Sequence, residues 1–127
     1  MEANHKIIRP YVPQNCQPNA HLYFLKFVSL DVRIHFIEFM KAQAIQTPFH
    51  YVPLHSSPAG LKFSRFAGED EYTTTESEKL VRLPLWFNLK FEEVNRVIER
   101  VHYYFSHEKN TQLAHSYSEE KLAVSQS

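Results

Sequence analysis

A run of nine residues from Ala20 to Val28 (AHLYFLKFV) is apolar or aromatic at every position except His21 and Lys26. A short and nearly continuous apolar run is typical of a strand that is buried on both faces of a sheet. We therefore expect this segment to form the central strand of the fold.

The two ends of the chain differ from its middle. Residues 1–18 carry three prolines around short apolar pieces, and proline cannot donate to a central ladder, so an extended arm or an edge strand is expected there. Residues 108–127 are polar and aperiodic, which predicts a disordered tail. The folded domain is therefore expected to span residues 19–107.

Two segments predict helices. No turn residue interrupts the thirteen positions from 31 to 43, and either Ser29 or Asp31 can cap the start of a helix there. Residues 92–105 give the stronger prediction, because apolar residues recur on one stripe while Glu92 and Arg96 are spaced for an ion pair on the other face. The stripe consists of Val94, Val97, Ile98, Val101 and Phe105.

Shorter elements fill the middle of the chain. Phe49–Val52 is expected to be a short strand that runs into a loop stiffened by prolines. The polar stretch 69–81 predicts a short surface helix with Thr74 or Thr75 as its cap and Glu78 completing a capping box. Strands and helices thus interleave, and the expected fold class is α/β (α+β), with a three- or four-stranded sheet covered by helices.

Composition excludes several classes of function. The chain has 14 basic and 14 acidic side chains, so its charge does not favour a nucleic acid or an anionic membrane as a partner. Its two glycines are too few for a glycine-rich phosphate loop. Cys16 is the single cysteine. Because the sequence also shows no signal-peptide pattern and no membrane-spanning run, the cytoplasm is the expected location.

Histidine and serine patterns do not predict a metal centre or a catalytic residue. His50 and His55 are five residues apart, as are His102 and His107, whereas ligands on one helix face are four apart, so no metal site is expected. Ser56 follows His55 directly, but neighbours in sequence seldom face each other. We expect the serines of this loop to bond backbone groups instead.

The remaining candidate is the loop from Phe49 to Gly60 (FHYVPLHSSPAG). It concentrates histidine, tyrosine and serine side chains between prolines, and a stiff loop loses little entropy when it binds a ligand with hydroxyl or phosphate groups. The alternative is that His50 and Tyr51 only close the core and keep their polar ends in water. Composition does not decide between these two interpretations.

The same loop carries a family resemblance. Its HYVPLHSSP block, together with NAHLYFLKF at residues 19–27 and FIEFMKAQ at residues 36–43, resembles the C-terminal part of the pyridoxal-phosphate-dependent sugar-nucleotide aminotransferases of the DegT/DnrJ/EryC family. The resemblance covers residues 7–107. It implies the small C-terminal domain of a fold-type-I enzyme, which closes over a substrate held at a larger domain.

The resemblance also implies where the chemistry of such an enzyme lies. A lysine of the large domain forms the Schiff base with pyridoxal phosphate, and glutamate supplies the amino group. None of the lysines of this chain matches that motif. We therefore expect a fragment that binds no cofactor covalently and is inactive alone. Its candidate partners are a large-domain or full-length aminotransferase chain and a dTDP-sugar. The alternative is a non-catalytic interaction module that docks on such a homologue.

Four site residues follow from the same resemblance. His50 and Tyr51 match the family's histidine–tyrosine pair, which approaches the cofactor and the sugar from the small-domain side. His55 and Ser56 match the neighbouring turn, which shapes the nucleotide-sugar pocket. All four are therefore predicted to bind substrate, and none is predicted to be catalytic.

The sequence departs from the family pattern at two helix ends. Ala44 stands where a glycine usually ends the first helix, and Lys90–Phe91 stands where a capping serine or threonine usually precedes the last helix. If Ala44 is left-handed, its Cβ costs roughly 1 to 2 kcal/mol. The lost cap costs about 1 kcal/mol.

Overall fold

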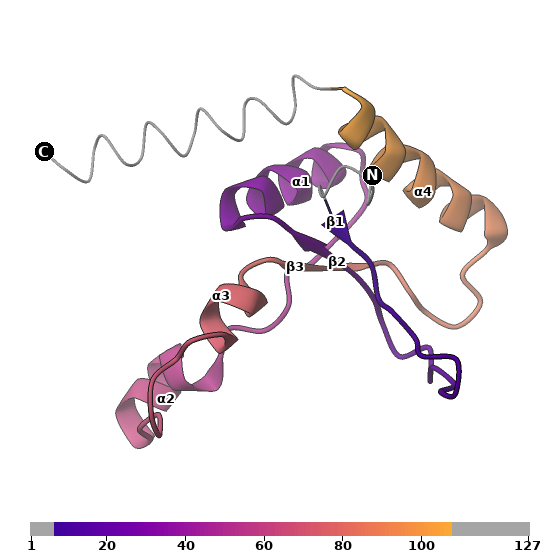
Figure 1. The fold of residues 1–127 in the computed structure, drawn as a ribbon. Helices are drawn as coiled ribbons and strands as arrows, with labels where there is room; N and C mark the ends of the chain where they lie inside the picture. The colour runs from indigo at the N-terminus through magenta and orange to yellow at the C-terminus, as the bar shows by residue number, and fades with distance from the viewer. Residues whose placement is uncertain (1–6, 108–127) are drawn as a thin grey trace, which may run out of the picture.

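The computed structural model describes residues 7–107, which form a three-stranded antiparallel sheet with helices packed on it (Figure 1). Residues 1–6 of the predicted arm and the predicted tail, residues 108–127, lie outside the described residues. Within residues 7–107 no helix is both long and apolar enough to cross a bilayer. In chain order the elements are β1 (Ile7–Ile8), β2 (Tyr23–Phe27), α1 (Leu30–Ala42), the 3-10 turn η2 (Leu54–Ser56), α2 (Pro58–Phe63), α3 (Thr73–Ser77), β3 (Leu80–Leu83) and α4 (Phe91–Ser106).

β2 is the central strand, as its sequence predicts. It pairs antiparallel with the two-residue edge strand β1 on one side and with β3 on the other, where Leu25 lies opposite Val81. The expectation that β2 is buried on both faces is wrong. Leu25 and Phe27 are 2% exposed, whereas Phe24 and Lys26 are only half-buried because alternate side chains point to the opposite face of the sheet. Only one face of the sheet therefore belongs to the core.

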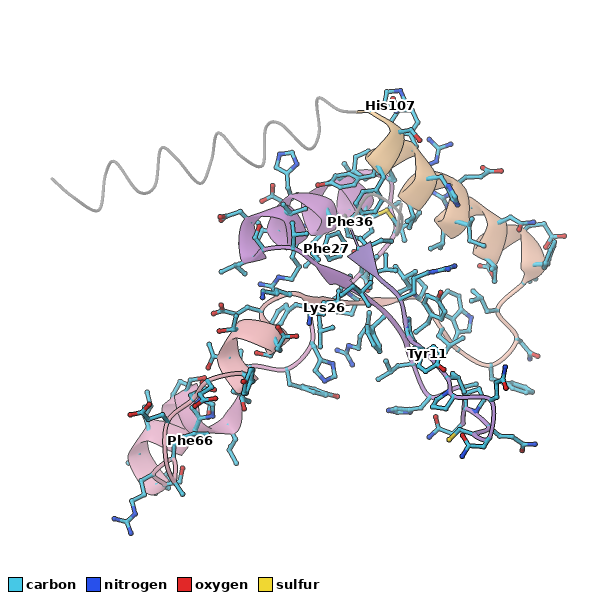
Figure 2. All side chains as sticks on the ribbon, in the orientation of Figure 1. Tyr11, Lys26, Phe27, Phe36, Phe66 and His107 are labelled. Atoms are coloured by element: carbon cyan, nitrogen blue, oxygen red, sulfur yellow. The ribbon has the colours of Figure 1, made fainter. Side chains whose placement is uncertain are left out.

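The hydrophobic core lies between this buried face and the helices α1 and α4 (Figure 1). Aromatic rings form its centre. The ring of Phe36 in α1 is fully buried and lies 4.8 Å from that of Phe27 and 5.2 Å from that of Tyr104, measured between centroids. Burial raises the pKa of Tyr104 to about 12. Figure 2 shows Phe27 and Phe36 within this layer, so contacts between rings fix how the two helices sit on the sheet.

The two long helices begin differently. The hydroxyl of Ser29 accepts a hydrogen bond from the amide of Val32 at 3.4 Å, so Ser29 and not Asp31 caps α1. Lys90 precedes α4 and supplies no side-chain acceptor, but the carboxylate of Glu93 accepts a hydrogen bond from the amide of Lys90 at 2.9 Å. Half of a capping box therefore remains at the start of α4.

The C-terminal end of α1 is a Schellman motif. Ala44 has a φ of 55°, in the left-handed region. The amide of Ile45 donates to the carbonyl of Met40, and the amide of Ala44 donates to that of Lys41. Met40 and Ile45 are both buried in the core, so this turn also fixes the exit direction of the chain. The conditional expectation of a left-handed Ala44 is confirmed.

Replacing Ala44 with glycine is expected to stabilise the domain by about 1 kcal/mol, because glycine adopts positive φ without a steric penalty. Chemical denaturation of both proteins measures the difference in unfolding free energy. Replacing Ala42, which lies in the helical conformation two residues earlier, with glycine serves as the control and is expected to destabilise by about 1 kcal/mol. Equal effects at the two positions would contradict the left-handed assignment.

The predicted ion pair between Glu92 and Arg96 is replaced by a tertiary contact. Nη2 of Arg96 donates to the backbone carbonyl of Gln43 at 2.7 Å. Gln43 is the C-terminal cap of α1, and carbonyls at a helix end need an external donor. Arg96 therefore connects α4 to the end of α1.

The middle of the chain departs most from its sequence-based predictions. The expected strand 49–52 is reduced to one isolated bridge between Phe49 and Val81. The third strand is instead β3 at residues 80–83, which no pattern predicted. The helix α2 at residues 58–63 was also not predicted. It begins with Pro58 in its first turn and with the Ser57 hydroxyl accepting from the amide of Gly60 at 3.0 Å.

The predicted capping box of the polar stretch is also wrong. α3 is preceded by Tyr72, which makes no side-chain capping bond. The backbone amide of Thr74 donates instead to the carboxylate of Asp70, four residues earlier, at 3.3 Å. Figure 1 shows α2 and α3 extending away from the sheet. We refer to residues 53–79, which contain η2, α2 and α3, as the protruding lobe.

Candidate functional site

His50 and Tyr51 lie beside β3, held by backbone contacts. The amide of His50 donates to the carbonyl of Leu80 at 3.3 Å, and the rings of His50 and Tyr51 lie 5.0 Å apart. The guanidinium of Arg82 lies 5.0 Å above the Tyr51 ring, and its Nη2 donates to the carbonyl of Phe49 at 3.4 Å. The Tyr51 side chain is 68% exposed. The pair is thus held in place at its base and open to solvent at its polar end.

His55 and Ser56 lie in the protruding lobe. Nε2 of His55 is 2.8 Å from a carboxylate oxygen of Asp70, and the His55 ring packs 4.4 Å from that of Phe66. Figure 2 shows Phe66 in this lobe, away from the core rings Phe27 and Phe36. The hydroxyl of Ser56 donates to the carbonyl of Pro53 at 3.1 Å. As the sequence predicts, this serine bonds a backbone group.

The four predicted residues therefore form two groups with different surroundings. His50 and Tyr51 share one cluster with Arg82, whereas His55 holds together two parts of the protruding lobe that are 15 residues apart. The prediction that all four bind substrate stays a prediction. Tyr51 of the first pair is exposed, whereas in the second pair His55 is half-buried and the exposed Ser56 already bonds the Pro53 carbonyl.

The Asp70 carboxylate is the centre of the contacts that close the lobe. The Thr74 hydroxyl donates a short hydrogen bond to it, and this bond is the largest cause that holds the pKa of Asp70 below its usual value. Contacts with the Thr74 amide and with His55 act in the same direction, whereas partial burial opposes them. The ionised carboxylate is therefore the form that the folded lobe favours.

Lowering the pH is expected to loosen the lobe through Asp70. Because the pKa of Asp70 is lowered in the folded state, its stabilising contribution is complete above the ordinary carboxyl pKa of about 3.9 and is lost as the pH falls through the folded value. Amide hydrogen exchange in α3, corrected for the intrinsic pH dependence, should show this loss as the pH falls below about 4. The variant Asp70→Asn should lack it, and an identical pH profile in the variant would exclude Asp70 as the cause.

Arg82 is the residue of this cluster that sequence reasoning missed. It lies in β3 between Val81, which is fully buried, and Leu83, which lines the core. A single arginine between apolar residues is the alternation that a strand with one solvent face produces. The polar stretch before it, which predicts a helix up to residue 81, hides that alternation, and the structure ends α3 at Ser77 and begins β3 at Leu80.

Two hollows lie beside these elements. The larger, which we call the apolar groove, has a volume of about 650 Å³ and runs between α4 and the sheet. Its walls are mainly aliphatic and include Leu25, Leu83, Val94, Ile98 and Val101. The second, which we call the edge pocket, has a volume of about 500 Å³. It is lined by the side chains of His21, Gln46, Arg82, Pro84 and Trp86, among others.

The comparisons with known proteins agree with this architecture. A structure of a Streptococcus pneumoniae protein, named as a sugar aminotransferase and determined in its apo form, aligns with 90% of this chain at a TM-score of 0.60 and 22% sequence identity. The chain spans 28% of the length of that protein. At this identity the likeness shows the fold, a small aminotransferase domain. The model of the DegT/DnrJ/EryC1/StrS aminotransferase family matches residues 2–102. Because that match covers most of the chain, the protein belongs to the DegT/DnrJ/EryC1/StrS aminotransferase family.

Proposed function

We propose that this chain acts as the small C-terminal domain of a sugar-nucleotide transaminase in the cytoplasm. The motifs that carry the family resemblance resemble those of the enzyme that converts dTDP-4-oxo-6-deoxy-D-glucose to dTDP-4-amino-4,6-dideoxygalactose with glutamate as amino donor. That reaction belongs to the synthesis of enterobacterial common antigen. The chain contributes binding groups, chiefly His50 and Tyr51, to a site that a larger domain completes.

In this proposal the described residues supply no Schiff-base lysine for the cofactor of the family. Members of this family depend on pyridoxal phosphate, which supplies an electron sink when it is bound. No lysine lines the apolar groove or the edge pocket. Lys26 and Lys79 both engage Glu76 in ion pairs. Residues 7–107 therefore bind and orient a substrate in this proposal, and the Schiff-base lysine comes from another domain.

The exposed His50–Tyr51 pair is the observation that carries the proposal. An aromatic hydroxyl that is open to solvent gains nothing for the stability of the core. The guanidinium of Arg82 packs on the Tyr51 ring, and hydrogen bonds at Phe49 and His50 fix the backbone that precedes it. A preorganised polar group of this kind loses little conformational entropy when it binds a ligand. The arrangement supports the ligand-binding interpretation of the loop over the interpretation in which the pair only closes the core.

Two measurements test this function. The 127-residue chain alone is expected to transfer no amino group from glutamate to dTDP-4-oxo-6-deoxy-D-glucose and to give no Schiff-base absorbance with pyridoxal phosphate. The same chain fused to the large domain of a family member is expected to be active, and Tyr51→Ala in the fusion should lower kcat/KM by roughly tenfold or more.

A matched control for that variant is Tyr72→Ala, because Tyr72 is equally exposed but lies in the protruding lobe. Its kcat/KM should stay within about twofold of the parent fusion. Turnover by the chain alone would overturn the proposal, as would equal effects of the two tyrosine variants.

The second candidate function is a non-catalytic interaction module that docks on a large-domain or full-length homologue. The apolar groove and the turn beside it favour this function. Trp86, Phe87 and Phe91 are all exposed around the start of α4, and Phe87 is 91% exposed. Large contiguous apolar surface on a folded domain is typical of a partner site.

A charged substitution in the apolar groove tests the interaction module separately from the transaminase function. Ile98 lines the groove and is 47% exposed, whereas Ile34 of α1 is 37% exposed and does not line it. Ile98→Glu should abolish co-purification with a large-domain chain, and Ile34→Glu should not. Co-purification that survives Ile98→Glu would place the partner surface elsewhere.

A further inference from the structure

The edge pocket has a positive lining. Arg82 and His21 are its ionisable residues, and neither aspartate nor glutamate lines it. A volume of about 500 Å³ lies within the range of small-molecule sites. Because Arg82 is half-buried, its charge acts in a medium of lower dielectric constant than water, where its attraction for an anion is stronger. The lining therefore favours an anionic ligand.

The guanidinium of Arg82 is fixed in position but is not neutralised by an acidic side chain of residues 7–107. Its contacts are the Phe49 carbonyl, through Nη2, and the face of the Tyr51 ring. Its Nε is shielded from solvent and has no hydrogen-bond acceptor among the described residues. Lys26, by contrast, is paired with Glu76. Arg82 is thus a preorganised cation without an acidic partner among the described residues, and a guanidinium is the group that phosphate oxygens bind best.

Flat side chains border the same pocket. Trp86, which is 54% exposed, lines it together with the imidazole of His21, and Tyr51 stands on the far side of the guanidinium of Arg82. An exposed indole offers a face on which a planar ring can stack. The pocket therefore combines an anion-binding group with a stacking surface.

We propose that the edge pocket binds a phosphate ester that carries a planar ring, with Arg82 holding the phosphate and Trp86 stacking on the ring. This inference deepens the proposed function and rests on it for the choice of a nucleoside diphosphate as the ligand. Arg82 lines the pocket and also contacts the ring of Tyr51, so a nucleotide held by its guanidinium lies near that tyrosine. Pyridoxal phosphate is also a phosphate ester that carries a planar ring, so it is tested separately.

Titration of the isotope-labelled 127-residue chain with thymidine 5′-diphosphate, followed by NMR, tests the proposal. The indole N–H of Trp86 and the Nε–H of Arg82 should shift in a saturable way, and the shifts should weaken as salt is raised. Pyrophosphate should displace the nucleotide, and thymidine, which lacks phosphate, should bind at least about tenfold more weakly. Pyridoxal phosphate is titrated in parallel, and tighter binding of that compound at the same residues would identify it as the source of the phosphate ester.

Substitutions then test whether Arg82 and Trp86 bind the nucleotide. Arg82→Gln should weaken nucleotide binding by roughly tenfold, and Arg65→Gln, an exposed arginine of the protruding lobe, should not change it. If Arg82→Gln disturbs the fold, Arg82→Lys and Trp86→Ala replace it, and each should weaken binding several-fold. The inference is overturned by unchanged affinity in the Arg82 and Trp86 variants, by equal binding of thymidine, or by shifts confined to other surfaces.

The two proposals can fail independently. An active fusion whose small domain shows no Arg82-dependent nucleotide binding would exclude the edge pocket and leave the proposed function. Arg82-dependent binding by the chain together with a folded but inactive fusion would leave the pocket and exclude the transaminase role.

Discussion

Replacing Phe36 with alanine is expected to destabilise the domain by about 3–5 kcal/mol, which is a large fraction of the total stability of a domain of this size. Phe36 is fully buried, and its ring contacts those of Phe27, Tyr104 and Phe105. Removing it leaves a cavity where both α1 and α4 meet the sheet. The unfolding free energy from urea or thermal denaturation measures the loss.

The control for this variant is Phe63→Ala. Phe63 ends α2 in the protruding lobe and is 79% exposed, so its removal should change the unfolding free energy by less than about 0.5 kcal/mol. A cost for Phe36→Ala below about 2 kcal/mol would mean that the core does not depend on the four rings as the structure has them.

Replacing Gly60 with alanine is expected to abolish the ordered structure of the protruding lobe. A Cβ on Gly60 would lie 1.6 Å from the carbonyl oxygen of Leu54 and 2.7 Å from its carbon. These are backbone atoms of the adjoining 3-10 turn and cannot move without separating η2 from α2. Overpacking of this severity costs more than the usual 1–3 kcal/mol, and the lobe has few buried side chains to offset it.

Amide hydrogen exchange resolves this effect by region. Amides of α2 and α3 should lose their protection in Gly60→Ala, while those of β2 and α4 keep it. The neighbouring variant Leu61→Ala is the control, because Leu61 is exposed in the same helix and should leave the protection of the lobe unchanged. Normal protection of α2 in Gly60→Ala would show that the turn and the helix do not pack as closely as the structure indicates.

Gly60→Ala also separates the two parts of the candidate site. His50 and Tyr51 are held by β3, so loss of the lobe should leave them in place, whereas the contact of His55 with Asp70 should be lost. The same substitution therefore asks whether His55 takes part in substrate binding or only in closing the lobe.

The elements that the sequence predicted are those whose residues carry a complete local pattern. α4 has five apolar residues at helical spacing, and the apolar run of residues 20–28 contains the central strand. In both cases a few neighbouring residues contain the signal, so no distant contact is needed to interpret it. The family resemblance marks Ala44 as a possible left-handed position, and its φ of 55° agrees.

The elements that were missed depend on partners far away in the chain. β3 has four residues, so its alternation is short and the polar stretch before it hides it. The strand forms because β2 offers it hydrogen-bond partners along its whole length. Residues 49–52 are as apolar as a strand, yet only Phe49 bridges to Val81 because the chain then turns into the lobe. Arg96 similarly donates to the carbonyl of Gln43, 53 residues away, and does not pair with Glu92 on its own helix.

The sequence by itself determined the fold class, the central strand, the last helix and the family, because periodicity and motif spacing are local properties of the chain. The tertiary structure alone decided that only one face of the sheet belongs to the core, that His55 lies apart from His50 and Tyr51, and that Arg82 joins the pair. These facts depend on which side chains the pairing of β2 with β3 turns toward the helices. That pairing is a contact between residues about 56 positions apart, such as Leu25 and Val81, and no local pattern encodes it.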